Sequence, residues 1–204
     1  MIDAYLDGLE TRVGAGKPID RIASVASFFV SRVDSEVDKR LDALAANASG
    51  AERERILALR GRTAIANAKL AYQLFRERFA GPRWDALAAR GANLQRPLWA
   101  STSTKNPQYR DVMYVEQLIG PDTVNTLPPA TLEAFRDHGV VARTVDADVD
   151  GARRTIAEVE RAGVSLRAVT DKLLVDGLRS FEKSFDTLIG GLERKTREVG
   201  AGRA

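Results

Sequence analysis

The sequence predicts an α/β fold with parallel strands. Residues 25–30 (VASFFV), 97–101 (PLWAS) and 122–126 (DTVNT) are predicted as short buried strands, the first of them rich in β-branched and aromatic residues. Helical patterns separate the runs, and strands joined by helical crossovers pair in parallel. Three such strands cannot close a barrel, and an open sheet leaves two unprotected edges. We therefore expect the chain to be part of a larger architecture.

Helices are predicted on both sides of the first strand. An apolar stripe at helical spacing begins the chain, and the Gly- and Pro-containing residues 14–18 form a loop. After the strand, the carboxylates of Asp34, Glu36 and Asp38 open a helix, where the helix dipole favours them, and capping explains them better than a metal site. This helical stretch continues, broken, to residue 46. The stripe at the start consists of Ile2, Tyr5, Leu6 and Leu9.

A longer helix is predicted from about residue 52 to residue 80. Lys69 lies on it, and because lysines on helices are nearly always solvated we expect Lys69 on the surface. Further helices are predicted over 111–118, 131–137, 150–162 and 166–199. The last carries an apolar stripe that we interpret as core packing against neighbouring structure. Its members are Leu174, Leu178, Phe181, Phe185, Leu188 and Leu192.

Composition excludes several classes of function. The 204 residues include no cysteine and one histidine, which excludes disulfides, thiolate nucleophiles, Cys-ligated metals and multi-His sites. The 31 Lys and Arg residues against 28 Asp and Glu residues give a net charge of +3, and they alternate in sequence, so we expect no nucleic-acid partner. No apolar stretch approaches the length of a membrane span, and no secretory signal is visible. We expect a cytoplasmic protein.

Polar and charged residues follow the predicted strands. In α/β barrels the functional residues lie at the carboxyl ends of the strands and in the loops after them. Arg32 and Lys105 come from neighbouring strand ends, and two cations with hydroxyls between them suit a phosphate monoester. The alternative is that such an Arg pairs with a surface carboxylate. The candidates are Ser27, Phe29 and Arg32; Ser101, Thr102, Ser103, Lys105 and Asn106; and Asn125 or Thr126.

Two other features are assigned no functional role. His138 is predicted at a helix C-terminus, where a partly charged imidazole is favourable. Residues 14–18 (GAGKP) superficially suggest a phosphate-binding loop, but they lack the spacing and the Ser or Thr after the Lys that this motif requires, so we predict a plain turn.

Several long motifs resemble bacterial transaldolases of the longer subfamily. Residues 23–38 (ASVASFFVSRVDSEVD) are similar to the sixth-strand region and residues 61–72 (GRTAIANAKLAY) to the helix after it. Residues 95–107 and 120–128 are similar to the seventh and eighth strands, and residues 4–10 to the fifth barrel helix. The resemblance implies the C-terminal part of a (β/α)₈ barrel, with residues 1–204 as one partial barrel domain.

Transaldolases act in the pentose phosphate pathway without a metal or organic cofactor, so we expect none here. The resemblance implies transfer of a dihydroxyacetone unit from sedoheptulose 7-phosphate to glyceraldehyde 3-phosphate through a lysine Schiff base. It also implies an active-site serine at Ser27, a pocket aromatic at Phe29 and a phosphate-binding arginine at Arg32. Lys105, before Asn106, stands where many relatives have a second phosphate-binding arginine, and it keeps the charge without the bidentate geometry.

The resemblance begins after the family's first five strands, which carry the Schiff-base lysine and its acidic partners, so it implies no counterpart for them here. No lysine lies on any of the three predicted strands. We therefore expect a truncated transaldolase that binds sugar phosphates but is inactive alone, with its N-terminal half supplied elsewhere. The alternative is a non-catalytic sugar-phosphate-binding protein, or a half-barrel completed by a partner chain or a second copy.

Overall fold

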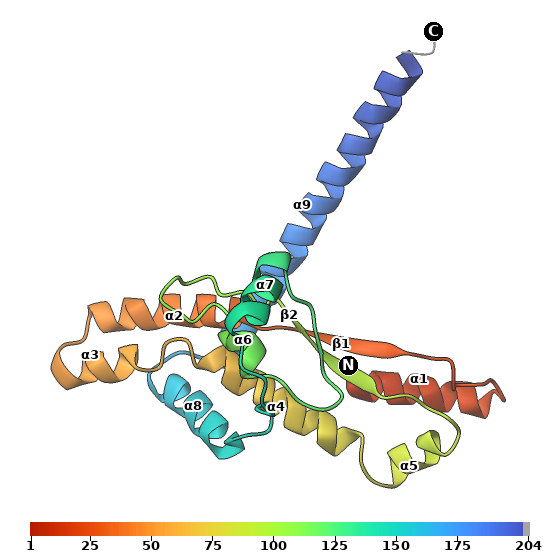
Figure 1. Ribbon diagram of the computed structural model, residues 1–204, viewed down its shortest axis with the longest axis horizontal. Helices are drawn as coiled ribbons and strands as arrows, with labels where there is room; N and C mark the ends of the chain where they lie inside the picture. The colour runs from red at the N-terminus through yellow and green to blue at the C-terminus, as the bar shows by residue number, and fades with distance from the viewer. Residues whose placement is uncertain (202–204) are drawn as a thin grey trace. The chain divides into compact units, whose positions relative to one another are not determined.

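The described part of the chain contains one sheet of three parallel strands, in the order β1-β2-β3. β1 spans Ser24–Phe29, β2 spans Gln95–Ala100 and β3 spans Val124–Asn125. The register pairs Ser27 with Leu98 across β1 and β2, and these two strands lie side by side in Figure 1. The predicted α/β fold with three parallel strands is confirmed.

This computed structural model describes residues 1–201, with side chains for residues 1–199, and the chain forms two compact units. Residues 1–164 form the first unit and the segment from Ser165 onward forms the second; residues 202–204 of the predicted domain lie outside the described residues. The second unit contains α9 (Leu166–Ala201). The helices of the first are α1 (Ile2–Gly14), α2 (Ser31–Ala46), α3 (Gly50–Leu57), α4 (Thr63–Arg78), α5 (Pro82–Ala88), α6 (Met113–Glu116), α7 (Pro129–His138) and α8 (Val149–Arg161).

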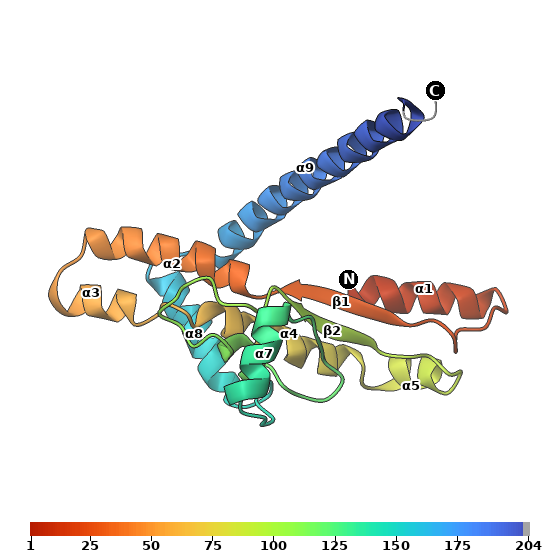
Figure 2. The same cartoon turned by 45° about the horizontal axis from the view of Figure 1, so that its top comes forward.

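One face of β2 is buried, and α4 packs against this strand. Trp99 on this face is 1% exposed, and its indole N–H donates to the Leu118 carbonyl at 3.1 Å. The Phe28 ring packs edge-on against the Trp99 ring, with 5.8 Å between the ring centroids. α4 in turn contacts α2 and α8, and both ribbon views show α3 folded back alongside α2 (Figures 1 and 2). The core of the first unit therefore lies between this face of the sheet and the helices.

The opposite face of β1 is exposed, so the prediction of a buried strand is wrong for this face. Val25 and Phe29 are 40% and 39% exposed, and Ser27 between them is also exposed. A parallel strand is buried on both faces only where other elements cover both. The short apolar run indicated a strand correctly, but it carried no information on how many of its faces are covered.

The helix predicted over 52–80 is two helices, α3 and α4. Gly61, between them, has a φ of +68°, a left-handed conformation that glycine adopts at little cost. α5 was not predicted, although Pro82 occupies its first turn, a favoured position for proline. In contrast, α2 is continuous where the sequence suggested a broken helix.

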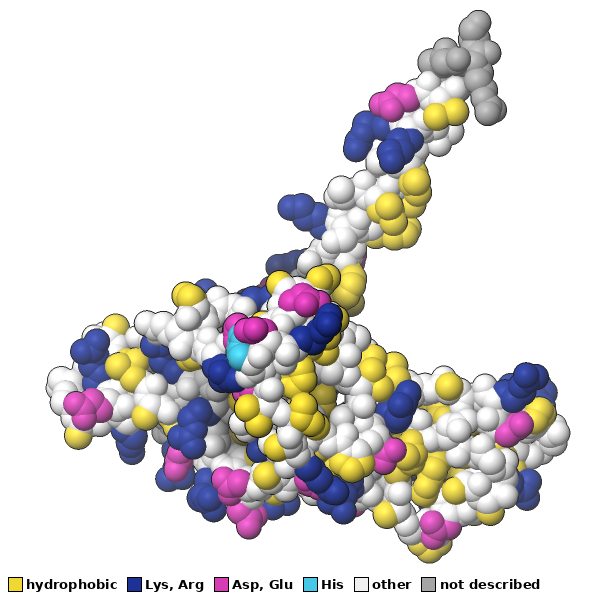
Figure 3. All heavy atoms as spheres, in the orientation of Figure 1, with side chains coloured by type: hydrophobic (Ala, Val, Ile, Leu, Met, Phe, Trp, Pro, Cys, Tyr) yellow, Lys and Arg dark blue, Asp and Glu magenta, His cyan; other side chains and the backbone are white. Residues whose placement is uncertain are grey.

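The apolar stripe of α9 is exposed, which corrects the expectation that it forms core packing. Its six predicted members are between 52% and 64% exposed. In Figure 3 apolar side chains line one side of this helix and Lys and Arg side chains another. Helical spacing shows which side chains share a face but not what covers that face. Over the described residues, no helix is both long and apolar enough to cross a membrane.

Replacing Leu41 on α2 by Ala tests this assignment of the core. Leu41 is 0% exposed, so we expect Leu41→Ala to lower the free energy of unfolding by about 2–5 kcal/mol through lost burial and an unfilled cavity. Urea unfolding followed by the fluorescence of the two tryptophans, Trp84 and the buried Trp99, measures the change. Leu174→Ala on α9 is the matched control, and an exposed position predicts a change within about 0.5 kcal/mol. Equal effects of the two variants would contradict this assignment.

Candidate functional site

The carboxyl ends of β1 and β2 are joined at the first turn of α2. Beyond the strands, the Val30 amide donates to the Ala100 carbonyl at 2.9 Å and the Ser31 amide to the Ser101 carbonyl at 3.0 Å. The hydroxyls of Ser31 and Ser101 are also 2.9 Å apart. Ser101 has a φ of 57°, so the chain turns sharply into the loop that follows β2. Loop and helix therefore start from one fixed point.

Phe29 and Arg32 are brought together at this edge. The guanidinium carbon of Arg32 lies 4.6 Å from the centroid of the Phe29 ring, a cation–π geometry. Arg32 is exposed on the first turn of α2, and Ser27 lies two residues before Phe29 on the same exposed face of β1. The structure thus groups all three predicted residues from the first strand region at or near the carboxyl end of β1.

Lys105 and Asn106 lie in the loop after β2, whose carboxyl end neighbours that of β1. The Lys105 amine donates to the Ser103 hydroxyl at 2.9 Å, and the Asn106 carboxamide oxygen accepts from the Gln108 amide at 2.9 Å. The first contact places a hydroxyl beside the cation. The second closes a tight turn that fixes the direction of the loop.

The candidate residues at the end of β3, Asn125 and Thr126, form hydrogen bonds that hold the loop after β2. The Asn125 side-chain oxygen accepts from the Thr102 hydroxyl at 2.8 Å, and the Thr126 amide donates to the Trp99 carbonyl at 3.1 Å. Thr102 is buried. These contacts fix the start of the loop that carries Lys105.

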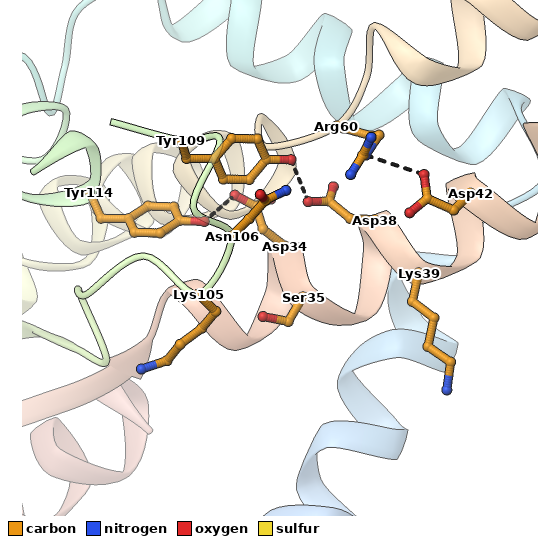
Figure 4. Close-up of a pocket in the computed structure, with 10 residues that line it drawn as sticks. All are labelled: Asp34, Ser35, Asp38, Lys39, Asp42, Arg60, Lys105, Asn106, Tyr109 and Tyr114. Atoms are coloured by element: carbon orange, nitrogen blue, oxygen red, sulfur yellow. Dashed lines mark hydrogen bonds and ion pairs between the residues drawn. The ribbon is translucent and has the colours of Figure 1, made fainter. Parts of the chain in front are cut away.

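A cavity of about 330 Å³ lies between α2 and this loop (Figure 4). Its lining contains three carboxylates, three cations and two tyrosines, and in the close-up the Lys105 amine points away from the carboxylates. The lining residues are Asp34, Ser35, Asp38, Lys39, Asp42, Arg60, Lys105, Asn106, Tyr109 and Tyr114.

Asp34 and Asp38 each join the start of α4 to the segment after β2. Asp34 is 1% exposed; one of its oxygens accepts from the Ala64 amide at 2.7 Å and the other from the Tyr114 hydroxyl at 2.8 Å.

Asp38, one turn later on α2, repeats this pattern. It accepts from the Gly61 amide at 3.0 Å and from the Tyr109 hydroxyl at 2.6 Å. Asp34 thus satisfies an amide in the first turn of α4 that has no partner within that helix, and Asp38 satisfies the Gly61 amide in the connection just before α4.

Burial raises the pKa of Asp34 to about 6, although hydrogen bonds from the Ala64 amide and the Tyr114 hydroxyl act in the opposite direction. Burial also raises the pKa of Asp38. The pKa values of Tyr109 and Tyr114 are raised by burial and by the carboxylates that accept their hydrogen bonds, so both tyrosines are neutral donors.

The role of Asp34 and Asp38 was missed from the sequence. They were assigned to capping and dipole stabilisation of their own helix, but their side chains are buried and bind amides in the first turn of α4 and in the connection before it. The available signal was their position: Asp34 and Asp38 share a helix face with the buried Val37 and Leu41. Acids on an apolar face indicate buried partners, but the sequence does not say which ones.

Lys69 is also corrected, because it is only 8% exposed rather than solvated. Its amine donates to the Ala147 carbonyl at 3.0 Å, just before α8, and burial lowers its pKa. Lys69 therefore ties α4 to the start of α8.

His138 lies at the end of α7 as predicted. Its ring nitrogens are 2.9 Å and 3.1 Å from carboxylate oxygens of Asp111 and Asp137, and these contacts raise its pKa. It is part of a surface ion-pair group. Within the described residues, no group of three or more His, Cys, Asp or Glu side chains is placed to hold a metal ion.

Comparison with known proteins identifies relatives along almost the whole chain. The Transaldolase/Fructose-6-phosphate aldolase family matches residues 4–192. The chain is 51% identical to the transaldolase of Parafrankia sp. over 190 residues, which are 93% of this chain and 50% of that protein. It is 48% identical to the transaldolases of Frankia alni and Thermobifida fusca, in each case over 98% of this chain and 52% of the relative. The chain thus spans about half the length of these relatives.

The buried Asp34 predicts a specific pH dependence of stability. Because its pKa is raised in the folded state, its favourable contribution is present below the ordinary pKa near 4 and is lost as the pH rises through about 6. In Asp34→Asn, an amide can accept from Ala64 and donate to the Tyr114 oxygen without a charge. As the pH rises from 4.5 to 7.5, we expect the melting temperature of the variant to increase relative to that of the original chain. Parallel curves over this range would show that Asp34 titrates as an ordinary carboxylate.

Proposed function

The chain belongs to the Transaldolase/Fructose-6-phosphate aldolase family, and we propose that it forms the phosphate-binding part of a transaldolase site. The substrates would be phosphorylated sugars of the pentose phosphate pathway, in the cytoplasm. The transaldolase reaction transfers a dihydroxyacetone unit from sedoheptulose 7-phosphate to glyceraldehyde 3-phosphate. The observation that carries the proposal is that, among the described residues, neither Arg32 nor Lys105 forms an ion pair with a carboxylate.

Both cations are available for an anion. No Asp or Glu side chain in the described part of the chain forms an ion pair with Arg32 or Lys105. Arg32 lies over the Phe29 ring and Lys105 donates to a neutral hydroxyl. This arrangement argues against the alternative that Arg32 serves a surface ion pair. Two cations at neighbouring strand ends suit the charge of a phosphate monoester.

Each predicted site residue has a role in the proposed binding of a sugar phosphate. Arg32 holds the phosphate through two N–H groups, and Lys105 adds a second positive charge. The Phe29 ring packs against the carbon chain of the sugar and keeps the guanidinium facing the phosphate. The Ser27 hydroxyl and the Asn106 side chain orient sugar hydroxyls. None of these residues breaks a bond, and no metal or organic cofactor takes part.

Carbon–carbon cleavage is assigned to the part of the barrel that this chain lacks. In the proposed complete enzyme, a lysine there condenses with the donor carbonyl, with loss of water, to a protonated Schiff base, and this iminium group accepts the electron pair of the broken bond as an enamine. The present residues hold the phosphate end of the substrate so that its carbonyl meets that lysine.

A second candidate is a half-barrel completed by another chain or a second copy. The exposed Val25 and Phe29 on one face of β1 favour it, because a face with large apolar side chains is stabilised when another element covers it. In that case the phosphate site is the same but the barrel is assembled from two chains.

Arg32→Ala tests the phosphate site. Because a hydrogen bond to a charged group contributes about 1.5–3 kcal/mol, we expect the variant to bind fructose 6-phosphate about tenfold or more weakly in isothermal titration calorimetry. Arg53→Ala, at an exposed position on α3, removes the same charge away from the site and should leave affinity unchanged. Similar losses in the two variants would reduce the effect to net charge and count against the site.

The isolated chain is expected to have no transaldolase activity. With fructose 6-phosphate as donor and erythrose 4-phosphate as acceptor, release of glyceraldehyde 3-phosphate should stay at the background rate. The preparation must be free of host transaldolase, and Arg32→Ala prepared in parallel controls for contamination. A rate above background that Arg32→Ala abolishes would place the complete chemistry within these residues.

A further inference from the structure

We propose that Tyr109 and Asp38 are positioning residues, whose hydrogen bond sets Lys105 and Asn106 at a fixed distance from Arg32. This inference rests on the proposed function, because it assigns to the pair a role in binding the phosphate of the substrate. Neither residue lies at the phosphate itself; they act through the loop between β2 and α6.

Both ends of that loop are attached to α2, the helix that carries Arg32. At its start, Ser101 meets Ser31 through backbone and hydroxyl hydrogen bonds. At its end, the Tyr109 hydroxyl donates to Asp38 at 2.6 Å. The two points on α2 are seven residues apart, about 10 Å along a helix. Because α2 is rigid, it fixes the positions of the two attachment points of the loop relative to the Arg32 guanidinium.

The Asp38 carboxylate cannot follow a moving loop. Its other oxygen accepts from the Gly61 amide at 3.0 Å, so the group is held from two sides. The Tyr109 ring is confined as well, since a β-carbon on Gly61 would lie 2.7 Å from its terminal ring carbon. Figure 4 shows the Tyr109 hydroxyl directed at Asp38. The position of Tyr109 is therefore tightly defined.

A short turn connects Tyr109 to the proposed binding residues Lys105 and Asn106. The Tyr109 amide donates to the Asn106 carbonyl at 3.1 Å, and the Asn106 side chain accepts from the Gln108 amide at 2.9 Å. Lys105 directly precedes this turn. Releasing the Tyr109 hydroxyl would leave the turn intact but free to move as a body, together with Lys105 and Asn106.

Tyr114 supplies a matched comparison. Its hydroxyl donates to Asp34, one helical turn from Asp38 on α2, so the chemistry of the bond is the same. Tyr114 lies in α6, beyond the loop, and is 1% exposed. Losing this hydroxyl affects the core of the first unit but does not release the turn at Asn106.

The experiment compares Tyr109→Phe and Tyr114→Phe in the 204-residue chain. Affinity for inorganic phosphate and for fructose 6-phosphate is measured by calorimetry, and the melting temperature is measured on the same samples. Because one hydrogen bond of about 1 kcal/mol is lost, we expect Tyr109→Phe to weaken both ligands about fivefold. Tyr114→Phe is expected to lower the melting temperature more but to change affinity by less than about twofold. Unchanged affinity in Tyr109→Phe, or equal losses in both variants, would overturn the proposal.

Hydrogen exchange separates this inference from the proposed function. If the original chain binds neither ligand, the proposed function fails, and exchange of the amides of residues 103–108 still tests the positioning role. Faster exchange there in Tyr109→Phe than in Tyr114→Phe supports positioning of the loop by Asp38. Equal exchange in the two variants overturns it.

Discussion

Two buried carboxylates on one helix join three segments of the first unit that are distant in sequence. Asp34 and Asp38 each divide their two oxygens between one amide in or just before the first turn of α4 and one tyrosine from the segment after β2. Removing a carboxylate from water is costly, and here two hydrogen bonds at each group offset part of that cost, so that the pKa of both carboxyls stays raised. The geometry of three segments distant in sequence therefore depends on a single face of α2.

The opposite side of α2 carries Arg32, the arginine of the proposed phosphate site. Arg32 is exposed and lies over Phe29, while Asp34, two residues later, is buried among partners from α4 and α6. The same short stretch thus supplies the cation of the proposed phosphate site and two carboxylates that anchor the surrounding structure. The first turn of this helix is also attached to the end of β2, because Ser31 is hydrogen-bonded to Ser101.

The sequence predicted local features well and tertiary partners poorly. Apolar runs located β1 and β2, and the rule that sites lie at the carboxyl ends of parallel strands selected Phe29 with Arg32. Covered and uncovered faces could not be distinguished, as the exposed Phe181 on α9 and the exposed Val25 show, because periodicity is a property of one element. Lys69 was misjudged for the same reason: its partner carbonyl comes 78 residues later.

Gly61 has a consequence for how this region can vary. Its positive φ disfavours any side chain, and the space that a β-carbon would fill is taken by the Tyr109 ring. Shortening residue 109 would open that space but leave the backbone strain, so the two positions are coupled without being interchangeable. In a related sequence with another residue at position 61, we expect both the α3–α4 connection and the loop that carries Lys105 to have a different structure. Substitutions at 61 and 109 should therefore be inherited together, as an epistatic pair.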